Sequence, residues 1–231
     1  MADLEQRTAA WYEARKGKLT ASNLGAALGQ VSYTSRAAAL RRALGTDKFE
    51  GNAATDWGTQ FEPTAIQQYE SLTGYRVEAT GLHTHPKYSW LAGSPDGLLG
   101  SEGMIEVKCP YYYFHCNSYY KLGKLPIYYY MQINALLEIC DRQWCDYICW
   151  TPVGMQVYRV HRDEETFEYL LPFYEQFYTA IEAQAEKPPP LTPEQKDEIT
   201  RTVKDAMLST VDYKLTFAEE DEPPRKLQRI I

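Results

Sequence analysis

Two carboxylates and one ammonium group lie near one another in the chain at a spacing that could support metal chemistry. Asp96 stands in a Pro-Asp-Gly turn, and Glu106 and Lys108 follow in a short apolar stretch. Side chains alternate between the two faces of a strand, so Glu106 and Lys108 project from the same face. If the two segments pair as a hairpin, Asp96 reaches that face as well.

Charged groups are costly to bury, and here they alternate with apolar residues. A hard divalent cation would offset this cost, because Mg²⁺ takes carboxylate and carbonyl oxygens and keeps waters and substrate phosphate as its remaining ligands. Lys108 would then orient or deprotonate the attacking water, or neutralise charge developing on phosphorus. The alternative is a plain salt bridge, since exposed strands often carry alternating charges.

The elements that must position these residues change character along the chain. Residues 1–74 are expected to be mainly helical, with Thr20 and Ser22 able to cap a helical turn over 23–28. Pro63 is expected to start or kink a helix over 57–72. Short β-type segments follow at 75–79, 90–93, 98–99, 104–109, 144–150 and 155–160, with a helix over 127–139 between the last two groups. This order predicts an α/β sheet with a crossover.

The domain organisation follows from a proline run. A main domain over 1–186 divides into a helical N-terminal segment, residues 1–74, and an α/β core at 75–186. Residues 187–190, Lys-Pro-Pro-Pro, form a semi-rigid spacer. The extension 187–231 is expected to hold a short helix over 193–209 and an acidic tail that is poorly ordered unless it docks.

Composition limits the choice of partner and compartment. The net charge of −7 argues against nucleic acid, but residues 7–48 carry eight basic and two acidic side chains, so this segment is +6 and the remainder −13. Arg41 and Arg42 belong to this segment and are candidates for DNA contact. Solvated helix faces are the equally weighted alternative. We expect a soluble, intracellular protein, because there is no secretion signal or membrane-spanning run, and five cysteines without a CxxC pair fit reduced thiols.

Five blocks of the sequence, in order, resemble the phage lambda exonuclease and YqaJ-like viral recombinase family of the PD-(D/E)XK nuclease superfamily. They are Trp11 to Ser22 (W-x-x-x-R, then T-A-S), Trp57 to Glu62 (W-G-x-x-x-E), Ser94 to Gly97 (S-P-D-G), Glu106 to Pro110 (E-V-K-C-P) and Met131 to Ile133 with its glutamine. The blocks extend over roughly residues 11 to 160. The resemblance implies a restriction-endonuclease-like α/β fold, a central mixed sheet flanked by helices, with the nuclease domain at 1–186.

The resemblance also implies roles for individual residues. The metal ligands would be Asp96, Glu106, the Val107 carbonyl and Glu62, with Mg²⁺ as the ion and Mn²⁺ as a substitute. Catalysis would further use Lys108 and Gln132, and a terminal five-prime phosphate would be bound by Arg15 and Ser22. Two positions depart from the pattern: Pro63 follows Glu62, and Asn134 replaces the second of the family's paired glutamines.

The function expected from this resemblance is a Mg²⁺-dependent exonuclease that degrades one strand of double-stranded DNA from its five-prime end and leaves single-stranded DNA for recombination or repair. The resemblance further implies a ring-shaped homotrimer and a single-strand annealing protein as partner, in the host cytoplasm or nucleus if the protein is viral. The alternatives are a structure-specific or restriction-type endonuclease on the same core, and a non-catalytic DNA-end-binding protein.

Two other signals carry less weight. The spacing of Cys140, Cys145 and Cys149 favours buried thiols over an iron–sulfur cluster, and the His83-x-His85 pair lacks a second pair at zinc-ligand spacing. The tyrosine-rich segment 111–130 could stack on a substrate strand, but for most of its rings packing is the preferred interpretation.

Overall fold

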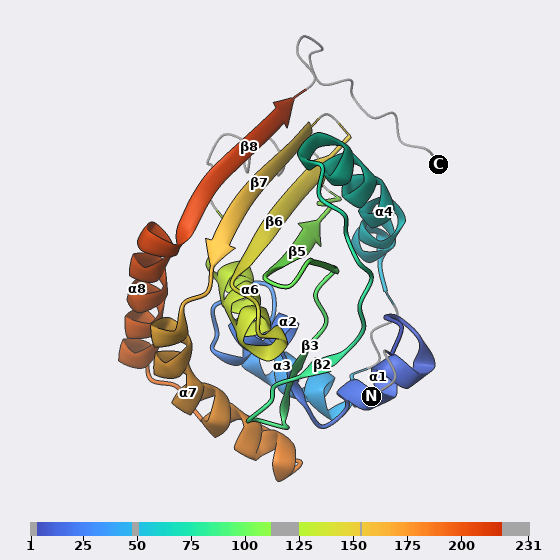
Figure 1. The fold of residues 1–231 in the computed structure, drawn as a ribbon. Coiled ribbons are helices and arrows are strands. Elements are labelled where there is room, and N and C mark those ends of the chain that lie inside the picture. The colour runs from blue at the N-terminus through green and yellow to red at the C-terminus, as the bar shows by residue number, and fades with distance from the viewer. Residues whose placement is uncertain (1–3, 48–50, 112–124, 153, 219–231) are drawn as a thin grey trace.

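The computed structural model describes residues 4–47, 51–111, 125–152 and 154–218. Its main feature is a five-stranded mixed sheet in the order β4-β5-β6-β7-β8 (Figure 1). The strands are β4 (Gly97–Leu99), β5 (Gly103–Lys108), β6 (Trp144–Thr151), β7 (Gly154–His161) and β8 (Val211–Ala218). The pair β5–β6 is parallel and the other pairs are antiparallel.

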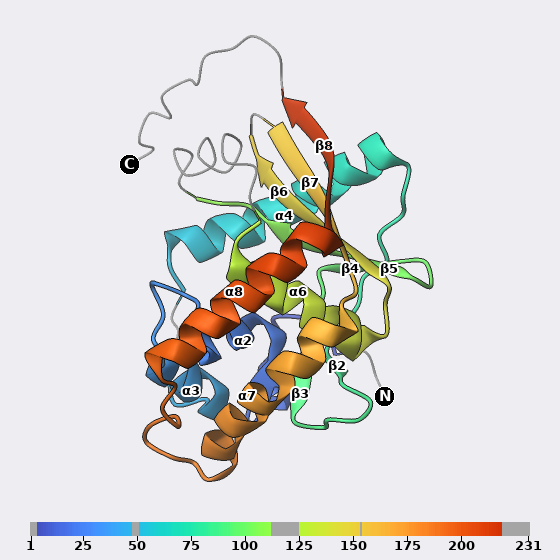
Figure 2. The same cartoon turned by 90° about the vertical axis from the view of Figure 1, so that its left-hand side faces the viewer.

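Helices cover both faces of this sheet. On one face, α4 (Ala53–Thr73) packs its Ala65 and Tyr69 against β5 and β6. On the other face, α6 (Ile127–Cys140) forms the crossover that parallel strands require, and α7 (Glu164–Glu182) and α8 (Pro193–Thr210) extend the same core (Figure 2). The residues of β5 therefore alternate between an α4 side and an α6 side.

A smaller three-stranded sheet and the N-terminal helices lie below the main sheet in Figure 1. Its strands are β1 (Leu19–Thr20), β2 (His83–Thr84) and β3 (Leu91–Gly93), in the order β1-β3-β2. The helices are α1 (Ala9–Arg15), α2 (Ala21–Ala27) and α3 (Arg36–Leu44). Strands β2 and β3 lead from α4 into the loop that carries Asp96, and β1 adds the parallel partner of β3.

Helices α2 and α6 approach each other closely because a glycine lies between them. A Cβ atom on Gly25 would stand 2.6 Å from the Cβ of Tyr128, a distance at which the two helices would have to separate. At Gly93 a Cβ would meet Leu136 of α6 at 2.4 Å and Ala21 of α2 at 3.2 Å. Glycine at these two positions therefore fixes the spacing of α2, α6 and β3.

The α/β sheet with a crossover is confirmed, with some differences in detail. Residues 75–79 do not form the expected strand, and only Glu78 pairs, in an isolated bridge with Leu98. Pro63 does not start its helix, since α4 begins at Ala53 and continues through it. Ser22 lies inside α2 rather than at its N-cap, and Thr20, which holds that position, makes no side-chain cap hydrogen bond.

The extension after residue 187 contributes to the main core. The expected helix is present as α8, held by a capping box between Thr192 and Gln195, and its Ile199 and Val203 are buried. Strand β8, which the sequence did not predict, pairs with β7. The acidic run at 219–222 lies outside the described residues. No helix among the described residues is long and apolar enough to cross a membrane.

Candidate active site

The hairpin of β4 and β5 brings Asp96 beside the strand that carries Glu106. The backbone N–H of Asp96 donates to the Ile105 carbonyl at 3.2 Å. In return, the Asp96 carboxylate accepts a 2.6 Å hydrogen bond from the Val107 N–H. Local backbone pairing thus sets the position of the first carboxylate relative to the second.

Glu106 is the centre of the site. Its side chain is 2% exposed, and its Oε1 accepts hydrogen bonds from Lys108 Nζ and, at 2.6 Å, from Gln132 Nε2 of α6. The other oxygen, Oε2, is buried without a hydrogen-bond partner among the described residues. An unsatisfied buried oxygen of this kind costs about 1–3 kcal/mol, and more when it is charged. Glu106 is therefore held in an arrangement that leaves one of its carboxylate oxygens without a hydrogen bond in the described part of the chain.

The pKa values of the site also show the cost of burying these charges. Burial, together with the nearby Asp96 carboxylate, raises the pKa of Glu106 to about 7, while Lys108 acts in the opposite direction. The pKa of Asp96 is also raised by burial. For Lys108, burial acts to lower the pKa, but the carboxylates of Glu106 and Asp96 outweigh it, so the pKa is raised. The lysine remains an ammonium group beside carboxylates that ionise reluctantly.

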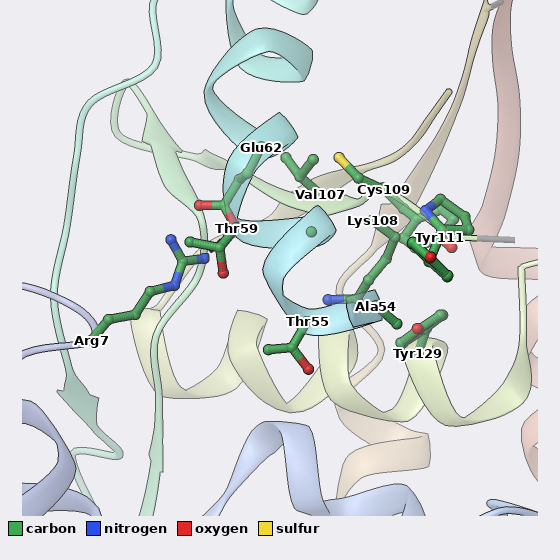
Figure 3. A pocket seen from close by; sticks show the side chains of 13 residues that line it. Arg7, Ala54, Thr55, Thr59, Glu62, Val107, Lys108, Cys109, Tyr111 and Tyr129 are labelled. Atoms are coloured by element: carbon green, nitrogen blue, oxygen red, sulfur yellow. Dashed lines mark hydrogen bonds and ion pairs between the residues drawn. The ribbon is translucent and has the colours of Figure 1, made fainter. Parts of the chain in front are cut away.

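Glu62 approaches the same place from α4. Burial and the charge of Asp96 raise the pKa of Glu62, and Arg7 opposes this shift through an ion pair with the Glu62 carboxylate. Figure 3 shows Arg7 and Lys108 pointing into the pocket from opposite sides, with Glu62 near Arg7. Pro63 leaves Glu62 on a continuous helix.

Arg7, Glu62, Val107 and Lys108 line a cavity of about 390 Å³, and the carboxylates of Asp96 and Glu106 lie behind this lining. It lies between the N-terminal half of α4, the end of β5 and the start of α6. Its lining includes, besides the residues already described, small and hydroxyl side chains of α4 and several tyrosines: Ala54, Thr55, Gly58, Thr59, Tyr111, Tyr129 and Tyr147. The end of β5 therefore opens into a space that can admit a ligand.

The donor set fits a hard divalent ion. The unpartnered Glu106 Oε2 and the raised pKa values of Asp96 and Glu106 are features that a cation would relieve. Among the described residues, no three His, Cys, Asp or Glu side chains gather into a ready-made metal site. An ion held here would therefore depend on few protein ligands and keep waters and substrate oxygens, as Mg²⁺ commonly does.

Arg15, the last residue of α1, lies beside Thr20 and Ser22 at the start of α2, and we call these three residues the Arg15 group. The Arg15 guanidinium donates to the hydroxyls of Ser22 and Thr20, each at 3.3 Å, and lies over the Trp11 ring at 4.1 Å. Burial lowers the pKa of Arg15 to about 10. Trp11 Nε1 in turn donates to the Ser94 hydroxyl at 2.9 Å, in the loop before Asp96. Trp11 thus connects the Arg15 group to the Asp96 loop.

The remaining candidates lie elsewhere. Arg41 and Arg42 are exposed in the last turn of α3 and do not line the cavity. Asn134 exchanges hydrogen bonds of 2.9 and 3.0 Å with the backbone of Asp163, the N-cap of α7, so it holds two helices together. His83 bonds Thr80, and the His85 ring accepts backbone N–H groups.

Arg7 lines the cavity and pairs with Glu62, and no feature of the sequence indicated this placement. It was counted only within the basic segment, and no spacing connects it to Glu62, which lies 55 positions away in the chain. Gln6, its neighbour, donates to the Pro95 carbonyl at 2.8 Å. Of the tyrosine-rich segment, residues 112–124 lie outside the described residues. Tyr111 and Tyr129 line the cavity, whereas Tyr130 is fully buried.

Comparison with known proteins places this geometry in context. The family model of the YqaJ-like viral recombinase domain matches residues 10–143, more than half of the chain. An uncharacterized protein of Acanthamoeba polyphaga mimivirus is 24% identical over 157 residues, which covers 62% of this chain but only 29% of that relative.

Solved structures give a closer match. The chain is similar to an alkaline exonuclease from Laribacter hongkongensis, with a TM-score of 0.65, 28% identity, and coverage of 86% of this chain and 99% of that one. The same exonuclease in complex with dAMP gives a TM-score of 0.68 at the same identity and coverage. A phage-related exonuclease from Haemophilus somnus shares the fold at 14% identity, with a TM-score of 0.53 and coverage of 80% and 96%. The PD-(D/E)XK core expected from the sequence is confirmed.

Proposed function

Because the chain belongs to the family of the YqaJ-like viral recombinase domain, we propose that it is a Mg²⁺-dependent exonuclease that degrades one strand of double-stranded DNA from its five-prime end. The observation that carries this proposal is the buried Glu106 carboxylate, whose Oε2 has no described hydrogen-bond partner and whose neighbours are Asp96 and Lys108. A site built only for stability would satisfy that oxygen. The similarity to an alkaline exonuclease supports the same reaction class.

Asp96 and Glu106 would hold the ion, with the Val107 carbonyl and Glu62 as further candidates. When bound, Mg²⁺, or Mn²⁺ in its place, supplies Lewis-acid polarisation of the phosphate and a more acidic water. Lys108 carries a fixed positive charge beside the reacting phosphate and stabilises the charge that develops on its oxygens. Gln132 holds Glu106 through the 2.6 Å hydrogen bond and so orients one oxygen, leaving Oε2 for the ion.

The choice of substrate end rests on the Arg15 group. A guanidinium and two hydroxyls within 3.3 Å form a set of donors suited to an anion. A terminal five-prime phosphate has an additional charge and more free oxygens than an internal phosphodiester. We propose that Arg15 and Ser22 select it, while Arg41 and Arg42 contact the backbone of the duplex away from the cavity. Such contacts weaken steeply with salt.

The nuclease core and the extension after residue 187 are proposed to act as one unit, in a homotrimer that surrounds DNA and works beside a single-strand annealing protein. Its products would serve recombination or repair. A restriction-type or structure-specific endonuclease, and a non-catalytic end-binding protein, are the competing functions.

Digestion of a linear duplex with one labelled five-prime end, compared with a covalently closed circle, tests the proposal. We expect Mg²⁺-dependent release of the labelled end from the linear duplex and no cleavage of the circle. Cleavage of the circle would indicate an endonuclease. Binding of ends without cleavage in Mg²⁺ or Mn²⁺ would indicate a binding protein, and full activity in excess chelator would exclude the metal mechanism.

A further inference from the structure

The positively charged guanidinium of Arg7 lines the cavity, and the proposed reaction assigns it no role. Arg7 reaches Glu62 from the segment before α1, and its side chain is 43% exposed although Glu62 is only 21% exposed. Its backbone φ is 67°, a left-handed value that is uncommon for residues other than glycine. Conformations of this kind persist where the surroundings enforce them and often occur at functional sites.

The surroundings of Arg7 fix its backbone and leave its side chain facing the cavity. Gln6 anchors the segment through the carbonyls of Pro95, at 2.8 Å, and Thr80, at 3.3 Å. Thr8 follows as the N-cap of α1 and accepts a hydrogen bond from the Trp11 N–H. Arg7 is therefore held between two anchored residues, and its charge also acts on Asp96.

The negative charges of Glu62 and Glu106 are thus partly neutralised by basic side chains of the same protein. Lys108 pairs with Glu106, and Arg7 pairs with Glu62. If Glu62 takes part in holding a divalent ion, Arg7 and the ion compete for the same carboxylate. Lys108 is 24% exposed and is held by its bond to the buried Glu106, whereas the Arg7 side chain is 43% exposed and can turn away from Glu62.

We propose that Arg7 binds the substrate phosphate, and that it becomes available for this role when a divalent ion takes over Glu62. This inference rests on the proposed function. The charges favour this proposal. The carboxylates of Glu62, Asp96 and Glu106 carry three negative charges, one more than the two positive charges of the neighbouring basic side chains. A divalent ion then leaves one positive charge in excess, which one phosphodiester neutralises. A guanidinium is also well suited to two phosphate oxygens at once.

The competing interpretation is that Arg7 only holds Glu62 in place. The two interpretations predict opposite changes in metal affinity. If Arg7 competes with the ion, its removal strengthens ion binding by roughly tenfold, within the usual range of coupling between two sites. If Arg7 only orients Glu62, its removal weakens ion binding or leaves it unchanged.

The test uses the full chain with Arg7→Gly, which suits the positive φ, and Arg7→Gln, which keeps a polar side chain. Arg76→Gln is the matched control, because Arg76 pairs at 3.9 Å with Glu70 on the same helix as Glu62 but is 89% exposed and does not line the cavity. Mn²⁺ affinity without DNA is measured by electron paramagnetic resonance. Affinity for a five-prime-phosphorylated duplex end is measured in Ca²⁺, which we expect to support binding without rapid cleavage.

We expect both Arg7 variants to bind Mn²⁺ about tenfold more tightly and the DNA end about tenfold more weakly than the wild type, with the control unchanged in both assays. Unchanged or weaker Mn²⁺ binding, or unchanged DNA binding, would overturn the proposal. Failure of the proposed function is a separate result: a wild type that binds Mn²⁺ but does not degrade a linear duplex would refute the nuclease activity while the effect of Arg7 on Mn²⁺ binding is still measured.

Discussion

The main sheet carries two buried carboxylates in neighbouring strands, one on each face, and their surroundings differ. Asp146 of β6 faces α4 and accepts hydrogen bonds from Arg159 Nε at 2.8 Å, from Arg159 Nη2 at 2.8 Å and from the Tyr69 hydroxyl at 2.7 Å. Glu106 of β5 faces α6 and keeps one buried oxygen without a described partner. Burial of charge alone therefore does not identify a catalytic residue. The unsatisfied oxygen of Glu106, beside Asp96 and Lys108, is what supports its proposed role as a metal ligand.

The largest expected effect comes from replacing the unsatisfied carboxylate. Glu106→Gln keeps the shape of the side chain but removes a charge that an ion requires, so Mg²⁺-dependent hydrolysis of linear duplex should fall by roughly 1,000-fold. The variant should unfold at the same or a higher temperature in chelator, since a buried charge is lost. Initial rates and thermal unfolding measure the two effects. Near wild-type turnover would show that Glu106 is not a ligand.

The opposite result is expected for the satisfied carboxylate. Asp146→Ala leaves the guanidinium of Arg159, whose side chain is only 12% exposed, without its carboxylate partner, so the free energy of unfolding should fall by about 3 kcal/mol. The turnover of the folded fraction should persist, because Asp146 bonds Tyr69 and Arg159 and none of the proposed metal ligands. Urea unfolding and rates corrected for the folded fraction test this. A loss of turnover without a loss of stability would contradict the comparison.

Two positions on α6 repeat the contrast on a smaller scale. Gln132→Ala removes the donor that orients Glu106, so the rate should fall about tenfold with little change in stability. Asn134→Ala removes the bonds to the α7 N-cap and should cost about 1–2 kcal/mol of stability with little change in rate. If the two variants exchanged these effects, the assignment of Gln132 to the site would be wrong.

The smallest effect concerns pH in the absence of metal. The pKa of Glu106 is raised in the folded state to about 7 from the usual 4.5, so the folded protein keeps a proton that the unfolded chain has already lost. The contribution of Glu106 to stability is therefore fully present below about pH 4.5 and is lost as the pH rises through about 7. In chelator, the unfolding temperature of the wild type should fall relative to that of Glu106→Gln between about pH 5 and about pH 8. Parallel curves would show that the pKa is not raised.

The hairpin at the centre of the candidate site could be predicted from the sequence because its contacts are local. The hairpin that joins Asp96 to Glu106 depends on a turn and on strand alternation, both of which can be recognised in the sequence. Gln132 and Glu62 were reached only through family resemblance, since their approach depends on how α6 and α4 pack on the sheet. No sequence pattern indicated that Arg7 lies beside Glu62, which is 55 positions away in the chain.

The fold shows the same limit. The periodic helix α6 was expected, whereas β8 was not, because an edge strand is stabilised by pairing with β7 rather than by its own sequence pattern. At 75–79 the residues have β-type character, but only Glu78 finds a partner. In both segments, tertiary contacts rather than local sequence determine whether a strand forms.

The close packing of α2 on α6 at Gly25 has a consequence for the length of the product. Ser22 lies on one of these helices and Gln132 on the other, and the contact between Gly25 and Tyr128 allows little sliding between them. If one DNA strand occupies both the Arg15 group and the cavity, the distance from its terminal phosphate to the bond being cut is constant. The protein would then release fragments of one fixed length. A bulkier residue at Gly25 would shift the two helices and make the fragment length variable.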